Sequence, residues 1–200
     1  MTDNRPRLLL HSCCAPCSSS VLERLCPDYR VTVFYYNPNI WPEAEYLRRK
    51  AEQIRLIGEV WAGEVDYIEG DYRPEVFEAA ARGLEDCPER GARCERCFAL
   101  RLGCTARKAA ELGFDCFCST LTVSPHKDAA VVNRVGREAG ERAGVPWLTS
   151  DFKKKDGYLR SLQLSEQYGF YRQRYCGCRY AARPEDKQAE AGGPESTVRR

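Results

Sequence analysis

Segments with the pattern of buried strands alternate with segments typical of amphipathic helices along most of the chain, and this alternation most constrains the fold. Short apolar or β-branched runs predict strands, and apolar residues every three or four positions predict helices. The expected strands are 7–11, 30–36, 65–68, 114–119 and 145–148, and the expected helices begin near 18–20 and cover 42–58, 74–82, 94–112 and 128–143. Strands that alternate with helices form a parallel sheet. The sequence therefore predicts an α/β fold, a parallel sheet flanked by helices.

The length and composition predict one folded unit with a tail. A chain of 200 residues can bury roughly two thirds of its unfolded surface without crosslinks. Residues 1–180 are expected to form a single α/β domain. Residues 181–200 are polar, with few bulky apolar side chains, and are expected to be disordered. The net charge of +2 is too small to indicate a nucleic-acid partner by itself.

The chain contains twelve cysteines, several times the ordinary usage. Its first residues are polar and the apolar run 8–10 is too short for a signal peptide, and no segment is long and apolar enough to span a membrane. We therefore expect a cytoplasmic protein without a membrane partner. In a reducing compartment, clustered thiols more often bind metal or carry out redox chemistry than form structural disulfides.

The first cysteine group, in HSCCAPC, lies between the first expected strand and the helix that follows it. Its members are Cys13, Cys14 and Cys17. The carboxyl ends of parallel strands are where such sheets bind ligands, and a helix N-terminus favours the thiolate that ligates metal. One or two of these thiols could instead be small buried apolar side chains.

Two further pairs of cysteines carry chemistry. Cys94 and Cys97 form a CxxC motif at the start of a predicted helix, and with Cys13 and Cys14 they supply four soft ligands, which suit zinc or an iron-sulfur cluster equally well. Cys176 and Cys178 form a CxC motif that could cycle between dithiol and disulfide or could ligate metal. The remaining cysteines with an apolar setting are expected in the core: Cys26, Cys104, Cys116 and Cys118.

A nucleotide-binding ATPase is a further reading of an α/β sheet with a loop site. The chain contains neither a GxxxxGK[ST] loop nor a GxGxxG loop, and its first strand leads into cysteines where a glycine-rich loop would be needed. These features argue against ATP use.

Six separated segments resemble one known family. They are HSCCAPC at 11–17, YNPNIWP at 36–42, RCERCFALRL at 93–102, STLTVSP at 119–125, DFKK at 151–154 and YRQRYCGCRY at 171–180. This ordered set is similar to the pattern of the QueH-type epoxyqueuosine reductases, and it covers nearly all of residues 7–180. Such a match is far more specific than a single CxxC motif.

The resemblance implies an oxidoreductase with a Rossmann-like fold of the HUP, or adenine nucleotide alpha hydrolase-like, type. It implies reduction of epoxyqueuosine to queuosine at the wobble position of tRNA, the last step of queuosine biosynthesis, with an electron donor that is not identified. Carried over to this chain, the family pattern assigns a [4Fe-4S] cluster to Cys13, Cys14, Cys94 and Cys97. Cys176 and Cys178 would be the redox-active pair. The resemblance also implies an additional mononuclear iron beside the cluster, with Cys17 as a further candidate ligand at a position where some members have Asp.

A tRNA substrate requires basic side chains for phosphates and aromatic rings for stacking on exposed bases. The candidates for phosphate contacts are Arg90, Arg93, Lys153, Lys154, Arg172 and Arg174. The candidates for stacking are Tyr36, Trp41 and Tyr171. The candidates for the proton donor are Tyr35, Tyr36, His11 and Asp151. For each basic or aromatic residue, ordinary surface or core is the alternative.

Two other functions fit parts of the sequence. A zinc-stabilised RNA-binding module would use the same four cysteines in a tetrahedral site. A thiol-disulfide oxidoreductase acting on proteins would use Cys176 and Cys178 as its active pair. Neither alternative accounts for all six segments together.

Overall fold

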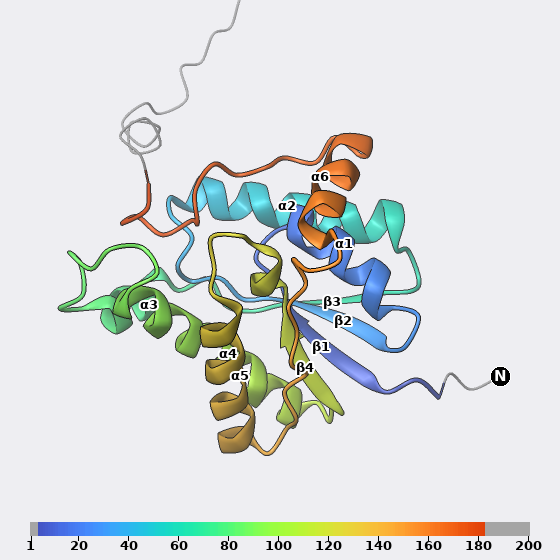
Figure 1. The fold of residues 1–200 in the computed structure, drawn as a ribbon, viewed down its shortest axis with the longest axis horizontal. Helices are drawn as coiled ribbons and strands as arrows, with labels where there is room; N and C mark the ends of the chain where they lie inside the picture. Colours follow the sequence, from blue (N-terminus) through green and yellow to red (C-terminus); the bar gives the residue numbers. More distant parts are fainter. Residues whose placement is uncertain (1–3, 183–200) are drawn as a thin grey trace, which may run out of the picture.

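Four parallel strands form the central sheet, in the order β3-β2-β1-β4 (Figure 1). The structure, a computed structural model, describes residues 4–182. The strands are β1 (Arg7–His11), β2 (Arg30–Tyr35), β3 (Asp66–Glu69) and β4 (Cys116–Ser119). In this register Leu9 of β1 lies beside Thr32 of β2 and Phe117 of β4. The predicted α/β class is confirmed, and the HUP-type assignment stays a prediction.

Helices cover both faces of this sheet. They are α1 (Ala15–Leu25), α2 (Glu43–Val60), α3 (Pro74–Ala81), α4 (Ala92–Glu111), α5 (Ala129–Ala143) and α6 (Gly157–Gln167), with a 3-10 turn, η1 (Thr120–Val123). Leu8 and Leu10 pack against the face covered by α1, α2 and α6. Leu9 packs against α4 and α5 on the other face. Adjacent strand residues point to opposite faces, so one short leucine run anchors both layers.

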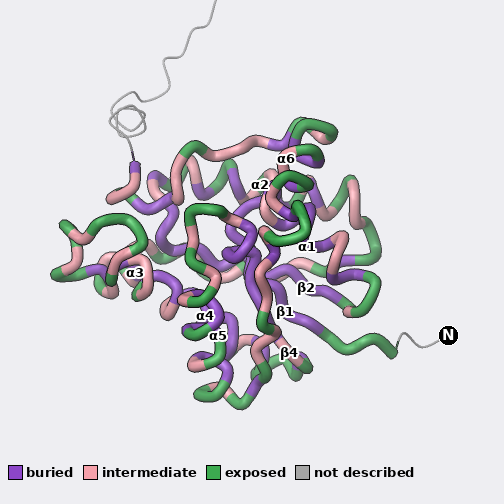
Figure 2. Tube along the Cα trace, viewed as in Figure 1, coloured by how far each residue is buried: buried purple, intermediate pink, exposed green. Residues whose placement is uncertain are grey.

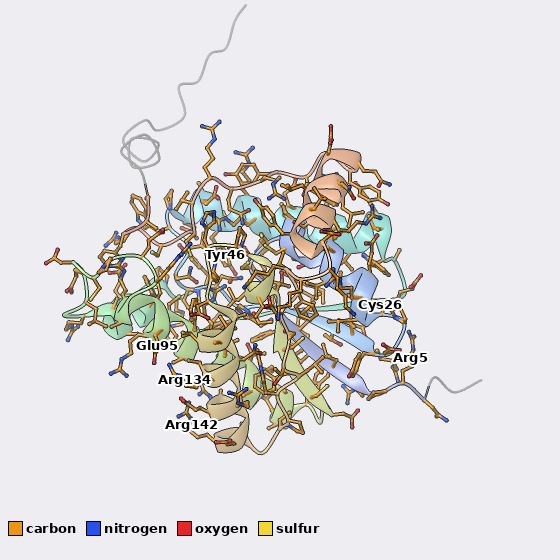
Figure 3. The ribbon with its side chains drawn as sticks, viewed as in Figure 1. Arg5, Cys26, Tyr46, Glu95, Arg134 and Arg142 are labelled. Carbon is orange, nitrogen blue, oxygen red and sulfur yellow. The ribbon has the colours of Figure 1, made fainter. Side chains whose placement is uncertain are left out.

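The buried sheet explains why β1 has a continuous apolar sequence. Leu8, Leu9 and Leu10 are all 0% exposed, and the strands form the buried centre of the chain trace in Figure 2. A parallel sheet covered on both faces has no solvent-facing side, so its strands need not alternate apolar and polar residues. At the molecular surface, Glu95 of α4 pairs with Arg134 of α5 at 2.8 Å (Figure 3). Such an exposed pair contributes less than about 1 kcal/mol, so apolar packing holds these helices together.

The predicted strand over 145–148 is wrong. This segment makes an isolated parallel bridge between Phe117 and Trp147. The Phe117 N–H donates to the Pro146 carbonyl oxygen, and the Leu148 N–H donates to the Phe117 carbonyl oxygen. Pro146 has no N–H to extend the ladder, so the segment lies beside β4 without forming a strand.

Other boundaries differ in informative ways. Helix α1 begins at Ala15 rather than near 18–20, with Cys14 as its N-cap and a proline in its first turn. Proline is well suited to the first turn because no intrahelical N–H bond is lost there. The helix α6 and the turn η1 have no counterpart in the sequence prediction. None of the helices within residues 4–182 combines the length and hydrophobicity that crossing a bilayer requires.

The predicted disordered tail over 181–200 lies, from 183 onward, outside the described residues. Ala181 and Ala182 are described. Ala182 is buried, and Ala181 packs against the cluster that contains Phe77, Cys97 and Cys178. The last described residues therefore belong to the packed structure around the cysteines.

Candidate metal and redox centre

Three sulfur atoms meet where β1 ends and α1 begins. The Sγ atoms of Cys13, Cys14 and Cys17 all lie within 4.8 Å of one another, and those of Cys13 and Cys14 are 3.8 Å apart. Within residues 4–182, no other set of three or more Cys, His, Asp or Glu ligands is this compact. Three soft ligands at such distances can hold a metal ion. The tight turn between strand and helix is what brings them together.

The three thiols differ in pKa, because each is hydrogen-bonded to the others. Hydrogen bonds from the Cys14 and Cys17 thiols hold the pKa of Cys13 well below its ordinary value. The same contacts with Cys13 raise the pKa of Cys14 to about 12 and raise the pKa of Cys17 as well. One thiolate forms readily and the next is opposed by its charge. A bound cation would remove this opposition, which is the behaviour expected of a metal site.

A second sulfur group lines a small, largely apolar cavity of about 60 Å³. Cys94 and Cys97 reach it from the start of α4, and Cys176 and Cys178 reach it from the C-terminal segment. Phe77, Phe98 and Val131 also line it. The structure thus brings the CxxC and CxC motifs to one cavity.

A larger cavity of about 520 Å³ adjoins the first sulfur group. Cys13 and Cys17 line it, together with Lys127, Arg172 and Cys176. Four residues line both cavities: Glu89, His126, Lys127 and Cys176. Cys176 therefore stands in the wall between the two sulfur groups.

The predicted four-cysteine set is split between these two groups. Cys13 and Cys14 lie with Cys17, whereas Cys94 and Cys97 are outside that compact set. Cys94 nevertheless packs against the same buried cluster as Cys13 and Cys14. A four-iron cluster spaces its ligand sulfurs farther apart than a single ion does, so mutual contact of all four sulfurs is not required of such a set.

Arg101 is a buried cation that the sequence did not single out as part of the site. It is 1% exposed and donates to Asn37 Oδ1 at 2.7 Å, to His11 Nε2 at 3.3 Å and to Cys97 Sγ at 3.9 Å. No carboxylate of the described chain lies within ion-pair distance of it. Burying an unpaired charge is costly, so an anionic sulfur is its natural counter-charge. An arginine in a helical pattern gives no sequence signal of this burial.

His11 is a buried side chain in contact with Arg101. Its ring is 0% exposed, with Nδ1 2.8 Å from Ser119 Oγ and Nε2 3.2 Å from the Tyr36 carbonyl oxygen. Burial, reinforced by Arg101, lowers the pKa of His11 to about 3. The ring is therefore neutral, and it positions Arg101 and the end of β1.

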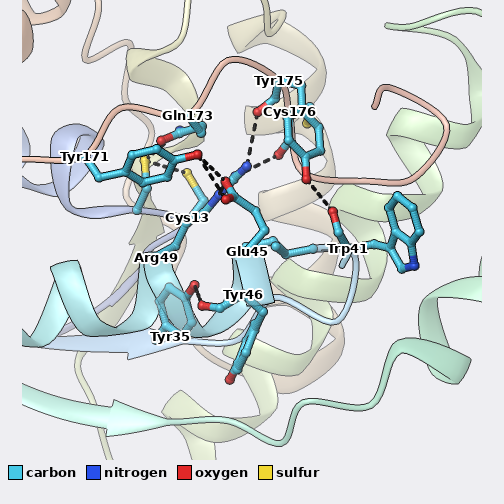
Figure 4. A network of polar contacts seen from close by, with 12 residues as sticks. Cys13, Tyr35, Trp41, Glu45, Tyr46, Arg49, Tyr171, Gln173, Tyr175 and Cys176 are labelled. Carbon is cyan, nitrogen blue, oxygen red and sulfur yellow. Dashed lines mark hydrogen bonds and ion pairs between the residues drawn. The ribbon is translucent and has the colours of Figure 1, made fainter. Parts of the chain in front are cut away.

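None of the four predicted proton donors lines either cavity. Tyr35, for example, is buried and donates to the carbonyl oxygen of Tyr46 (Figure 4). Asp151 is paired with Lys153 and Lys154. Lys127, in contrast, lines both cavities. Burial favours its neutral form, but the nearby Cys176, Cys13 and Cys17 sulfurs outweigh this and raise the pKa of Lys127, so it remains an ammonium.

Residues 171–178, here called the strap, dock the CxC motif onto helix α2 and the loop before it (Figure 4). Arg49 donates to the carbonyl oxygens of Tyr175 and Cys176, and the Trp41 N–H donates to the Gly177 carbonyl oxygen at 2.7 Å. Gly177 has a φ of 114°, which favours glycine, and a side chain there would meet Arg49. The glycine in the CxC motif is thus required by the backbone.

The residues predicted to contact phosphate differ in exposure and in their hydrogen-bond partners. Arg93 is 3% exposed and donates to the carbonyl oxygens of Leu84, Glu85 and Cys87, so it orders the preceding loop and is not free for phosphate. Arg172 donates to Ser161 and Ser165 while lining the larger cavity. The candidates that remain exposed are Arg90, Lys154 and Arg174, and Lys153 is half-buried.

The predicted stacking residues also differ from one another. Tyr36 is buried and stacks on Phe34, so it is not available to a base. The Tyr171 ring is covered by the Arg48 guanidinium at 3.5 Å. Trp41 is half-buried, with Arg179 over its ring. Of the cysteines predicted in the core, Cys26 and Cys118 are buried, whereas Cys104 and Cys116 are partly exposed.

Comparison with known proteins identifies similar chains. A family model described as "Epoxyqueuosine reductase QueH" matches residues 8–184. A Streptococcus pyogenes protein named epoxyqueuosine reductase QueH is 47% identical over 90% of this chain and 71% of its own length. Proteins of the same name from Staphylococcus epidermidis and Thermotoga maritima are 43% and 34% identical, over 89% and 86% of this chain and 77% and 88% of their own lengths.

Proposed function

This chain belongs to the QueH family of epoxyqueuosine reductases, and we propose that it reduces epoxyqueuosine to queuosine at the wobble position of tRNA. The observation that carries the proposal is the position of Cys176, which lines both the cavity of the CxxC motif and the larger cavity beside Cys13 and Cys17. A redox thiol between a ligand group and a substrate-sized cavity suits a reductase.

The donor set fits an iron-sulfur cofactor. In this proposal Cys13, Cys14, Cys94 and Cys97 hold a [4Fe-4S] cluster, and Cys17 is available to a separate mononuclear iron. All five donors are thiols, and the buried Arg101 and the charged Lys127 supply positive charge that an anionic thiolate-ligated group would neutralise. When bound, the cluster would supply single-electron transfer, and a mononuclear iron with an open position would supply a Lewis acid for the epoxide oxygen.

The CxC motif completes the electron balance. Oxidation of the Cys176 and Cys178 thiols to a disulfide releases two electrons and two protons. Reduction of the epoxide breaks both of its C–O bonds, forms a C=C bond and releases the oxygen as water, which consumes the same two electrons and two protons. An external donor, which is not identified, then returns the disulfide to the dithiol.

The larger cavity is the proposed place for the modified base. Its volume of about 520 Å³ suits a small ring system, and Lys127, Arg172 and Arg174 give its wall a positive charge. The exposed Arg90 and Arg174 are the proposed contacts for phosphates of the anticodon stem-loop.

The proposal is tested by metal analysis and turnover on one preparation. Anaerobically purified protein should contain iron and acid-labile sulfide in near-equal amounts, absorb in the visible range and convert epoxyqueuosine in tRNA to queuosine, measured by mass spectrometry of the nucleosides. Cys94→Ala should lose iron, whereas Cys116→Ala, at a half-buried position on β4, should retain it.

Two results would favour the alternatives. Stoichiometric zinc, with failed reconstitution by iron and sulfide, would favour the RNA-binding module. Reduction of insulin disulfides without action on tRNA would favour the protein thiol-disulfide oxidoreductase.

A further inference from the structure

One side chain of the strap contacts the first sulfur group directly. The Nε2 amide of Gln173 donates to Cys14 Sγ at 3.0 Å, across 159 positions of sequence. Cys14 is 1% exposed, so water does not compete for its sulfur. A short N–H to sulfur contact in a dry setting is a strong electrostatic interaction.

The amide of Gln173 is held chiefly by this sulfur. Its carbonyl oxygen, Oε1, is buried and has no hydrogen-bond partner among residues 4–182. A glutamine kept for structural hydrogen bonding would be expected to use both ends of its amide. Here the end that is satisfied is the donor, and it is satisfied by a sulfur atom.

The position of Gln173 in the chain adds a second consequence. Cys176 follows three residues later on the same strap, and Arg49 anchors the strap at the carbonyl oxygens of Tyr175 and Cys176. The segment that carries the redox thiol therefore also delivers a hydrogen-bond donor to a proposed ligand. Withdrawal of the strap would remove both together.

We propose that Gln173 is a positioning residue of the metal centre, which holds the Cys14 sulfur by its amide N–H and raises the reduction potential of the bound cluster. This inference rests on the proposed function, because it needs the cluster that Cys14 would ligate. A hydrogen bond to a ligand sulfur offsets part of its negative charge, so it stabilises the reduced, more negative form.

The test is the midpoint potential of the anaerobically reconstituted protein, measured by redox titration monitored by electron paramagnetic resonance. Gln173→Leu removes the donor with little change in volume and should shift the potential to a more negative value. Gln173→Glu, measured at alkaline pH, replaces the donor by a carboxylate and should shift it further. Gln163→Leu makes the same chemical change at an exposed position of α6 and should leave it unchanged.

The Gln173→Leu apoprotein should unfold at the wild-type temperature or above, because this substitution also removes the unpaired Oε1. A variant that folds but binds less iron than Gln163→Leu would support the contact as well. Equal potentials for Gln173→Leu and wild type, at equal iron and sulfide content, would overturn the inference. Wild-type protein that loads with iron and sulfide but leaves epoxyqueuosine unchanged would instead contradict the proposed function, and the comparison of potentials would still stand.

Discussion

Arg49 on helix α2 donates a 3.3 Å hydrogen bond to the backbone carbonyl oxygen of Cys176, which lies 127 positions later in the chain. The same guanidinium donates to the carbonyl oxygen of Tyr175 and pairs with Glu45 at 2.7 Å. Because two of its partners are backbone atoms, Arg49 fixes the path of the strap. The position of the CxC motif is thus set by a buried arginine on the second helix.

Replacement of Arg49 by Leu should destabilise the protein severely. The change frees the strap and leaves the largely buried Glu45 without its charge partner, with the Tyr171 hydroxyl still donating to its carboxylate. Breaking a buried pair typically costs about 3–5 kcal/mol. Urea denaturation of the apoprotein measures this loss. The double variant Glu45→Gln with Arg49→Leu should recover part of it, since no uncompensated charge remains. A loss below about 1 kcal/mol for the single variant would show that the strap does not depend on Arg49.

Replacement of Cys176 or Cys178 by Ser should abolish multiple turnover while leaving the iron content near that of the wild type. The reason is that a single thiol cannot form the disulfide that returns two electrons. Turnover of epoxyqueuosine tRNA and iron content are measured on the same preparations, with Cys116→Ser as the matched control. Full turnover in either variant would contradict the assignment of the redox pair.

Two glycines in helices should respond to alanine in opposite directions. A Cβ atom on Gly136 of α5 would overlap the Trp147 ring. The Nε1 of this ring donates a hydrogen bond to Asn133 Oδ1, which holds the ring in place. Gly136→Ala should therefore destabilise by about 1–3 kcal/mol. A Cβ atom on Gly58 of α2 would meet nothing within 4 Å, so Gly58→Ala should stabilise by about 0.5–1 kcal/mol. Thermal unfolding of the apoproteins measures both, and a stabilised Gly136→Ala variant would show that α5 packs differently against Trp147.

The buried thiol of Cys26 should make stability fall at alkaline pH. Burial raises its pKa from 9.0 to about 11. Above pH 9.0 the unfolded chain loses this proton while the folded chain keeps it, so the stabilising contribution is complete below pH 9.0 and is lost as the pH rises toward about 11. Cys26→Ala should therefore lose less stability than wild type over this interval, as measured by denaturation at several pH values. Parallel pH profiles for the two proteins would contradict the shift.

Local patterns were sufficient for most of the sheet. The predicted strand over 7–11 coincides with β1, and the other three strands of the sheet were placed within one or two residues. The failure at 145–148 was tertiary in origin, because an apolar run that contains Pro146 can lie beside a strand without continuing its hydrogen bonds. Helix α6 was missed between the expected last strand and the CxC motif.

The candidate site was likewise predictable from the sequence only in part. By itself, the sequence determined the α/β class, the cysteine-rich turn after β1 and the two spaced pairs, because strand and helix periodicity and motif spacing are local properties of the chain. Only the tertiary structure decided that Cys176 lies between two cavities and that the buried Arg101 contacts His11 and Asn37. These contacts join residues on different elements, and their distances depend on how helices cross the sheet and how the strap docks. No local pattern records that geometry.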